Sequence, residues 1–286
     1  MSNGFPQHRE YFTIEGRRIA YLTMGDPTAP ALVLIHGWMA AMADWHLFLP
    51  ELTANYHCIL VDLLGHGHSD KPHDGDYSIP AQARRVMAVV DELDVDDFLL
   101  CGHSMGGMIA FYITAILAPA RVQRLVNLAG IVHKNDWASW LLVWISTHIP
   151  SLVDLYFMFT RWMVKFPWGQ WLLTSTILHN WQRPQGYAQN LCYSVQPGME
   201  TPFWRAVEAI LALDMLPHLS QIACPVLTMV GQQDLIVSFK QVQLAEAHIP
   251  HQTVHILPKC GHHLMLEKPA ACLEKIHPFL AGQSRK

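Results

Sequence analysis

Residues 102–107 read Gly-His-Ser-Met-Gly-Gly, and the rest of the chain is organised around this stretch. The apolar run at residues 97–101 comes directly before it and predicts a buried strand. The apolar run at residues 108–113 follows it and predicts a helix packed in a core. Ser104 is therefore expected on a tight turn between the end of a strand and the start of a helix.

Two glycines flank this serine at the positions where a tight turn needs them. Gly102 and Gly106 leave room for a strained backbone and let helix and strand approach closely. The turn exposes the Ser104 hydroxyl and directs helix N–H groups at the atom it attacks. This G-x-S-x-G pattern resembles the nucleophile elbow of the α/β-hydrolase family.

Composition limits the possible functions. The chain has 286 residues, is 51% hydrophobic and 15% charged, and carries a net charge of −4, which argues against nucleic acid as a partner. Residues 1–7 contain no apolar core of a signal peptide, and no uncharged run reaches the roughly 18 residues of a spanning helix. The cysteines are scattered singly, as reduced core thiols are. We therefore expect a cytoplasmic protein without a spanning segment; the sequence does not indicate an oligomeric state.

Short apolar runs alternate with helical patterns along most of the chain. Residues 11–24 predict an antiparallel hairpin, and residues 43–53 and 78–93 predict helices. This alternation, with the resemblance, implies an α/β-hydrolase fold: a mostly parallel eight-stranded sheet flanked by helices, with an inserted helical cap. The further strand predictions are residues 31–35, 57–61, 122–129, 224–231 and 253–257.

The character of the chain changes between residues 131 and 216. Strand-like runs disappear, and eight of the ten tryptophans fall in this stretch. It resembles the helical cap that many α/β-hydrolases insert, which leaves residues 1–130 and 217–286 as the core. We expect most cap aromatics to pack cap against core and a minority to face substrate. A basic amphipathic helix containing Arg161 and Lys165 that lies on a membrane is a minor alternative, since Asp154 and the low charge weigh against it.

The resemblance also assigns an oxyanion loop. His36-Gly37 follows a predicted strand, as in the family, so the backbone N–H groups of Trp38 and Met105 are expected to bind the developing negative charge. We expect the substrate pocket to be lined by Trp38, Met39, His103, Trp137, Trp140 and Val237.

Two further matches to the family imply an acid and a base. Asp234 occupies the G-x-x-D position after a predicted strand, and His262 directly follows the glycine of a G-H-x-x-x-x-E-x-P segment. The order Ser104, Asp234, His262 is that of the hydrolase fold. His263 remains an alternative base, and Asp136 an alternative acid.

One loop offers a competing interpretation. Residues 62–69 match the family's D-x-x-G-x-G-x-S pattern, to which we assign a structural role. The same loop contains His66, His68, Asp70 and His73, which resemble a zinc motif of metallo-hydrolases with its last histidine misplaced. We therefore expect no metal, and no feature of the sequence calls for a cofactor.

A serine at the elbow indicates acyl transfer to water. Dehalogenases and epoxide hydrolases of this fold carry an aspartate there. We expect a carboxylesterase or lipase-like enzyme whose partner is a small apolar ester. Carbon–carbon bond hydrolysis and cofactor-free perhydrolysis use the same three residues, but the loop Trp38-Met39-Ala40-Ala41 lacks the glycines usual in carbon–carbon hydrolases. A hydrolase-like binding protein without turnover is a further alternative.

Overall fold

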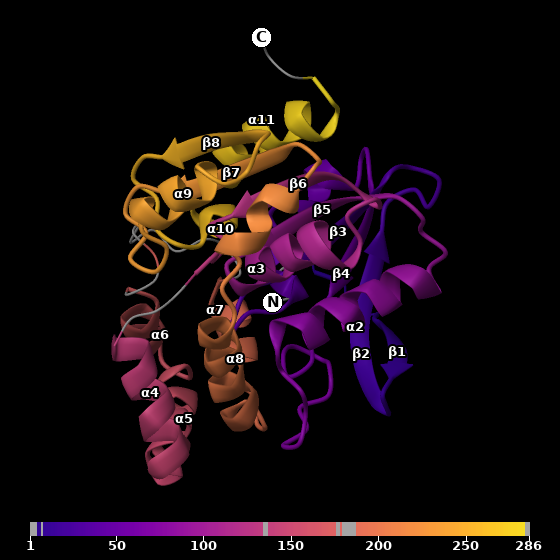
Figure 1. Ribbon diagram of the computed structural model, residues 1–286. Coiled ribbons are helices and arrows are strands. Elements are labelled where there is room, and N and C mark those ends of the chain that lie inside the picture. Colours follow the sequence, from indigo (N-terminus) through magenta and orange to yellow (C-terminus); the bar gives the residue numbers. More distant parts are fainter. Residues whose placement is uncertain (1–4, 7, 134–136, 176–177, 179–186, 284–286) are drawn as a thin grey trace.

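The computed structural model describes residues 5–6, 8–133, 137–175, 178 and 187–283. One eight-stranded sheet runs through it in the order β1-β2-β4-β3-β5-β6-β7-β8 (Figure 1). The pairs β1–β2 and β2–β4 are antiparallel, and every other pair is parallel. The predicted α/β-hydrolase sheet is therefore confirmed. The strands are β1 (Glu10–Ile14), β2 (Arg17–Met24), β3 (Ala31–Ile35), β4 (His57–Val61), β5 (Phe98–His103), β6 (Val122–Leu128), β7 (Val226–Gly231) and β8 (Gln252–Leu257).

The central strands are apolar because both faces of the sheet are covered. Every residue of β3, β5 and β7 is buried. Continuous apolar runs are typical of parallel strands between two layers of helices. The terminal strands β1 and β8 are more exposed, in keeping with their place at the edges of the sheet.

Helices flank the sheet, and one of them differs from expectation. Residues 43–53 form two short pieces in place of one helix, a 3₁₀ turn at Met42–Trp45 and α1 (Leu49–Leu52). Pro50 lies in the first turn of α1 and has no N–H to continue an earlier helix, so the chain starts a new helix there. The other core helices are α2 (Ile79–Glu92), α3 (Met105–Tyr112), α9 (Phe239–Glu246), α10 (Leu264–Glu267) and α11 (Pro269–Leu280).

Helices from the inserted stretch gather in a lobe on one side of the sheet (Figure 1). A small apolar cluster of Val153, Phe157, Met199 and Phe203 holds α5 against α8. Trp38 and Met39, from the loop after β3, pack on the same cluster. The lobe thus contacts the core close to the predicted oxyanion loop. Its helices are α4 (Trp137–His148), α5 (Pro150–Met163), α6 (Pro167–Thr174), α7 (Tyr187–Ser194) and α8 (Glu200–Ala212).

We refer to this lobe as the cap. Many of its side chains, which the sequence assigned to packing, are exposed. We call them the cap face; they lie on or next to α4, α5 and α6, and their exposed fractions run from 37% for Phe166 to 62% for Met158. The expectation that most cap aromatics pack against the core is therefore wrong for this set, because α4–α6 turn one face away from the sheet. The cap face consists of Leu141, Trp144, Ile149, Leu152, Leu155, Tyr156, Met158, Phe159, Trp162, Phe166, Trp168, Trp171 and Leu172.

Among the described residues, no helix is both long and apolar enough to cross a bilayer. None of the six cysteines, all of which lie in the described ranges, forms a disulfide, and four of them, Cys58, Cys101, Cys260 and Cys272, are buried.

Candidate active site

Ser104 is the single residue that connects the end of β5 to the start of α3. Its backbone has φ 54° and ψ −118°, a region that side chains rarely adopt. A Cβ on Gly102 would lie 2.3 Å from the carbonyl oxygen of Gly106, and one on Gly106 would lie 2.3 Å from that of Ile35. Both glycines are therefore required for helix, strand and neighbouring strand to meet this closely. The strained turn is the one that the sequence predicts.

A chain of hydrogen bonds links Ser104 to two residues distant in sequence. His262 Nε2 lies 2.9 Å from Ser104 Oγ, and His262 Nδ1 lies 2.8 Å from Asp234 Oδ2. Ser104 and His262 are 6% and 4% exposed. Asp234 lies in the turn after β7, where the backbone N–H groups of Ile236 and Val237 donate to its Oδ1 at 2.8 and 2.9 Å.

These bonds set the protonation of the acid and the base. Burial alone would raise the pKa of Asp234, but the hydrogen bond and charge of His262, with the two backbone N–H groups, lower it. An ionised Asp234 requires a proton on His262 Nδ1, which leaves Nε2 as the acceptor for the Ser104 hydroxyl. A histidine in this tautomer can remove the serine proton.

The sequence left His263 as an alternative base and Asp136 as an alternative acid. His263 also reaches the cavity, with its ring centroid 5.0 Å from that of His103, but the hydrogen bond of Ser104 goes to His262. Asp136 lies outside the described residues. The structure thus brings Ser104, Asp234 and His262 together, in the order that the sequence predicts.

The two predicted oxyanion donors lie beside Ser104. Met105 is the first residue of α3, so its N–H has no partner inside the helix. A Cβ on Gly37 would lie 3.0 Å from Ser104 Cβ, which places the backbone leading to Trp38 against the serine. The cap holds this loop, because Trp38 Nε1 donates to the carbonyl oxygen of Phe203 at 3.0 Å and Ser194 Oγ donates to that of Met39.

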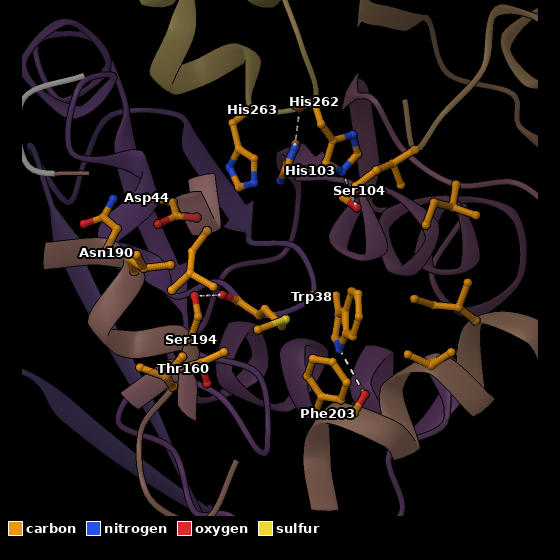
Figure 2. Close-up of a pocket in the computed structure, with 18 of the residues that line it drawn as sticks. Trp38, Asp44, His103, Ser104, Thr160, Asn190, Ser194, Phe203, His262 and His263 are labelled. Carbon is orange, nitrogen blue, oxygen red and sulfur yellow. Dashed lines mark hydrogen bonds between the residues drawn. The ribbon is translucent and has the colours of Figure 1, made fainter. Parts of the chain in front are cut away.

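Ser104 opens on a cavity of about 500 Å³ between core and cap (Figure 2). Trp38, Met39 and His103 line it. Val237 does not: it is buried in the main core, and Ile236 lines the cavity instead. Ile236 and Val237 are consecutive in the turn after β7, and the N–H groups of both bind Asp234, so their side chains point in different directions: Val237 into the core and Ile236 into the cavity. The side chains of Trp137 and Trp140 lie outside the described residues.

Sequence reasoning missed several polar groups on the cavity wall: Asp44, Thr160, Asn190 and Ser194. Three of them come from cap helices whose packing no local pattern reveals. Asp44 gave one signal, since it is the only acidic residue between positions 38 and 50 in an otherwise apolar stretch.

The loop after β4 is organised by a buried carboxylate. Asp62 accepts hydrogen bonds from the backbone N–H groups of Met42 at 2.7 Å and His68 at 2.8 Å. A Cβ on Gly67 would lie 2.2 Å from that carboxylate, so glycine is required there. Ser69 Oγ donates to the Asp62 carbonyl oxygen at 2.6 Å and ties the loop closed. These contacts fit the structural role that the sequence assigns to this stretch.

The side chains of the zinc-like motif point to separate partners. Asp70 pairs with Arg18 at 3.3 Å, and His73 Nδ1 lies 2.8 Å from Thr201 Oγ1. Burial lowers the pKa of His66 to about 3. In the part of the chain that the structure describes, no group of three or more histidine, cysteine, aspartate or glutamate residues could hold a metal ion.

Comparison with known proteins extends these observations. The chain is 28% identical to 2-hydroxymuconate semialdehyde hydrolase of Pseudomonas sp. (strain CF600) over 258 residues, which cover 87% of this chain and 86% of that protein. It is 24% identical to 3-oxoadipate enol-lactonase 2 of Acinetobacter baylyi, covering 92% and 93%. Its fold is similar to the crystal structure of a membrane phospholipase A, with a TM-score of 0.78, 25% identity and coverage of 96% and 86%.

A family model described as alpha/beta hydrolase fold matches residues 30–269. This range includes the elbow, the loop after β3, Asp234 and His262. The chain belongs to the alpha/beta hydrolase fold family.

Proposed function

We propose that this chain hydrolyses carboxylic esters with apolar acyl or alcohol groups through an acyl-enzyme on Ser104. The observation that carries the proposal is the continuous hydrogen-bond chain from Ser104 through His262 to Asp234, which opens on a largely apolar cavity. Apolar walls with a few placed polar groups are typical of small-molecule sites.

We assign each residue a role on the basis of the geometry. Ser104 Oγ attacks the ester carbonyl carbon while its proton passes to His262 Nε2, 2.9 Å away. The ionised Asp234 stabilises the resulting imidazolium, and the N–H groups of Trp38 and Met105 bind the oxyanion. His262 then returns the proton to the leaving alcohol, and water repeats the sequence on the acyl-enzyme. Residues 131–216 act as the cap over this site.

The direct test is covalent labelling together with turnover. A fluorophosphonate should add mass to a single peptide containing Ser104, and 4-nitrophenyl butyrate should release nitrophenol in a burst followed by a steady phase. Labelling at another residue would refute the role of Ser104. Labelling of Ser104 without any turnover would favour a binding protein.

A second candidate is hydrolysis of a carbon–carbon bond. The similarity to 2-hydroxymuconate semialdehyde hydrolase favours it, whereas the glycine-poor loop after β3 favours ester hydrolysis. Turnover of a vinylogous 1,5-diketone faster than of any ester in the same assay would select this second candidate.

A further inference from the structure

The cavity has a polar side that the proposed ester chemistry does not use. In Figure 2, Asp44, Asn190, Ser194 and Thr160 gather on one side of the cavity, and Ser104 lies on the other. Asp44 comes from the turn after β3, and the other three come from α5 and α7. Core and cap thus build this polar side together.

The three cap residues on this polar side can act as hydrogen-bond acceptors. Asn190 is 4% exposed; its Nδ2 lies 3.4 Å from the carbonyl oxygen of Ala43, and its Oδ1 is buried without a partner. Thr160 Oγ1 donates to a carbonyl one turn earlier on α5 at 2.9 Å, and Ser194 Oγ donates to the carbonyl of Met39. With their protons committed, both hydroxyls face the cavity as acceptors.

His103, which lies between His263 and His262 in Figure 2 and apart from the four residues of the polar side, offers a further acceptor. Its Nε2 donates to the carbonyl oxygen of His262 at 3.0 Å, and burial first, then the charge of His262, lowers its pKa to about 3. The ring is therefore neutral, and its Nδ1 carries a lone pair. This atom is buried without a partner. Buried polar atoms in native proteins almost always have a partner, so Asn190 Oδ1 on the polar side calls for a group that donates.

Asp44 makes the same side able to donate in return. Its carboxyl is 4% exposed and bonded to Asn190, and burial with the nearby Asp62 charge raises its pKa to about 7. Near neutral pH it is in part protonated. A ligand group that both donates and accepts would satisfy Asn190 Oδ1 and Asp44 together, whereas a ketone or carboxylate, which only accepts, would leave Asn190 Oδ1 without a donor.

We propose that this side of the cavity is a second subsite, which binds a hydroxyl group carried on the substrate's acyl chain away from the scissile carbonyl. The inference rests on the proposed ester hydrolysis and names its substrate class, hydroxylated acyl esters. It adds a specific polar group to the mostly apolar pocket that the composition of the cap predicts.

The test measures binding apart from turnover. Methyl ω-hydroxyalkanoates of four to twelve carbons and the matching methyl alkanoates are titrated into Ser104→Ala, and the ratio of the two Kd values is taken at each length. One net hydrogen bond corresponds to about a three- to tenfold preference. At the chain length that fits the cavity, we expect the preference for the hydroxy ester, measured as the ratio of the two Kd values, to be larger by this factor in Ser104→Ala than in Ser104→Ala combined with Asn190→Leu. Asp44→Leu, as a second variant, should abolish the same gain.

The control variant is Gln170→Leu, which removes a cap amide bonded to Val164 that does not line the cavity. It should leave the ratio unchanged. If the ratio of the two Kd values is the same with and without Asn190 and Asp44, the subsite proposal is wrong. Tighter binding of an ω-amino ester than of the ω-hydroxy ester would also overturn it, because it would indicate a site for cations. Turnover of methyl alkanoates by the wild-type chain separately tests the proposed function, so the two can fail independently.

A different observation concerns the outer surface of the lobe. The cap face is contiguous with the mouth of the cavity, because Tyr156 and Leu172 are 41% and 50% exposed and also line the cavity. Its charges are few. Asp154, beside a hollow shared with α8, and Lys165 are both exposed, and Arg161 is paired with Glu200.

These features favour one occupant. Tryptophan and phenylalanine suit the boundary between headgroups and acyl chains, and an exposed lysine suits anionic headgroups. A second copy bound face to face would cover Tyr156 and Leu172 and so obstruct the cavity mouth. We infer that the cap face docks on the surface of an anionic bilayer, with the cavity mouth toward the lipid.

The test is cosedimentation of the full chain with vesicles of phosphatidylcholine and phosphatidylglycerol. Phe159→Ser combined with Trp162→Ser should lower the partition coefficient by about tenfold or more. The matched control is Phe239→Ser, because Phe239 on α9 and Phe159 on α5 are both 52% exposed. Failure of the wild-type chain to sediment would overturn the inference. So would a dimer in analytical ultracentrifugation that the double variant abolishes, since a second copy would then cover the face.

Discussion

Ser104 and His262 share one hydrogen bond, so their substitutions should not be additive. Ser104→Ala should lower kcat by about 10⁴-fold, and His262→Ala added to it should change kcat little further, because the serine proton is then already absent. Steady-state kinetics of both single variants and the double variant check this. His263→Ala is the matched control, since its ring lies beside the same site without the bond to Ser104. A multiplicative loss in the double variant would contradict the shared role.

Asp44 should make stability depend on pH. Its folded pKa of about 7 lies above the ordinary value of about 3.9, so the folded state holds a proton that the unfolded state releases. The carboxyl therefore lowers stability progressively as pH rises from about 4 to about 7. The free energy of unfolding of Asp44→Asn, relative to that of the wild type, should rise by up to about 2–4 kcal/mol from pH 4.5 to pH 8. Urea unfolding at both pH values measures this. A pH-independent difference would show that Asp44 titrates normally.

Asp234 acts in the opposite direction. Its lowered pKa means that its contribution to stability is present above about pH 4 and is lost as pH falls through the lowered value. The cavity is therefore flanked by an ionised acid, Asp234, at its catalytic end and by a partly neutral acid, Asp44, on its polar side.

At the level of elements, α7 supports the loop after β3 through one hydroxyl. Ser194→Ala should lower kcat/KM for an unsubstituted ester by about tenfold, because the Met39 carbonyl loses its donor and the neighbouring N–H of Trp38 is held less firmly. Ser175→Ala is the matched control, since that hydroxyl donates to Leu172 near the end of its own helix at 2.8 Å. Equal losses in the two variants would show that any cap hydroxyl matters to the same degree.

Two phenylalanines on α5, two residues apart, should contribute very differently to the free energy of unfolding. Phe157 is fully buried and Phe159 is 52% exposed. Phe157→Ala should lower the free energy of unfolding by about 3–5 kcal/mol, whereas Phe159→Ala should change it by about 0.5 kcal/mol or less. Denaturant unfolding compares the two. A large loss at Phe159 would mean that α5 packs with this face inward.

The same helices show where sequence reasoning ends. The strands and the elbow follow local patterns, because burial and turn geometry act within a few residues. The assignment of Asp234 and His262 follows instead from the resemblance of their segments to motifs of the family. Helical spacing also predicts α5, but it cannot say which apolar face the core covers. The exposure of Phe159 and the approach of Asp44 to Asn190 depend on contacts between elements far apart in sequence. Local pattern also failed at Pro50, where a proline in a helical run begins a second helix.

For the molecule as a whole, the cavity between core and cap sets the substrate range. Its volume is about 500 Å³, and most of its wall is apolar, including Ile131, Leu191, Val207 and Ile210. Each buried CH₂ contributes about 0.8 kcal/mol of transfer free energy. Extending an acyl chain by two to four carbons should therefore raise kcat/KM by roughly one to two decades until the cavity is filled. The measurement is kcat/KM for 4-nitrophenyl esters from acetate to decanoate, below their micelle thresholds. Val237→Ala, which alters the core beside Asp234 without touching the cavity, should leave the position of the maximum in place. A maximum at acetate would mean that the acyl chain does not enter the space between core and cap.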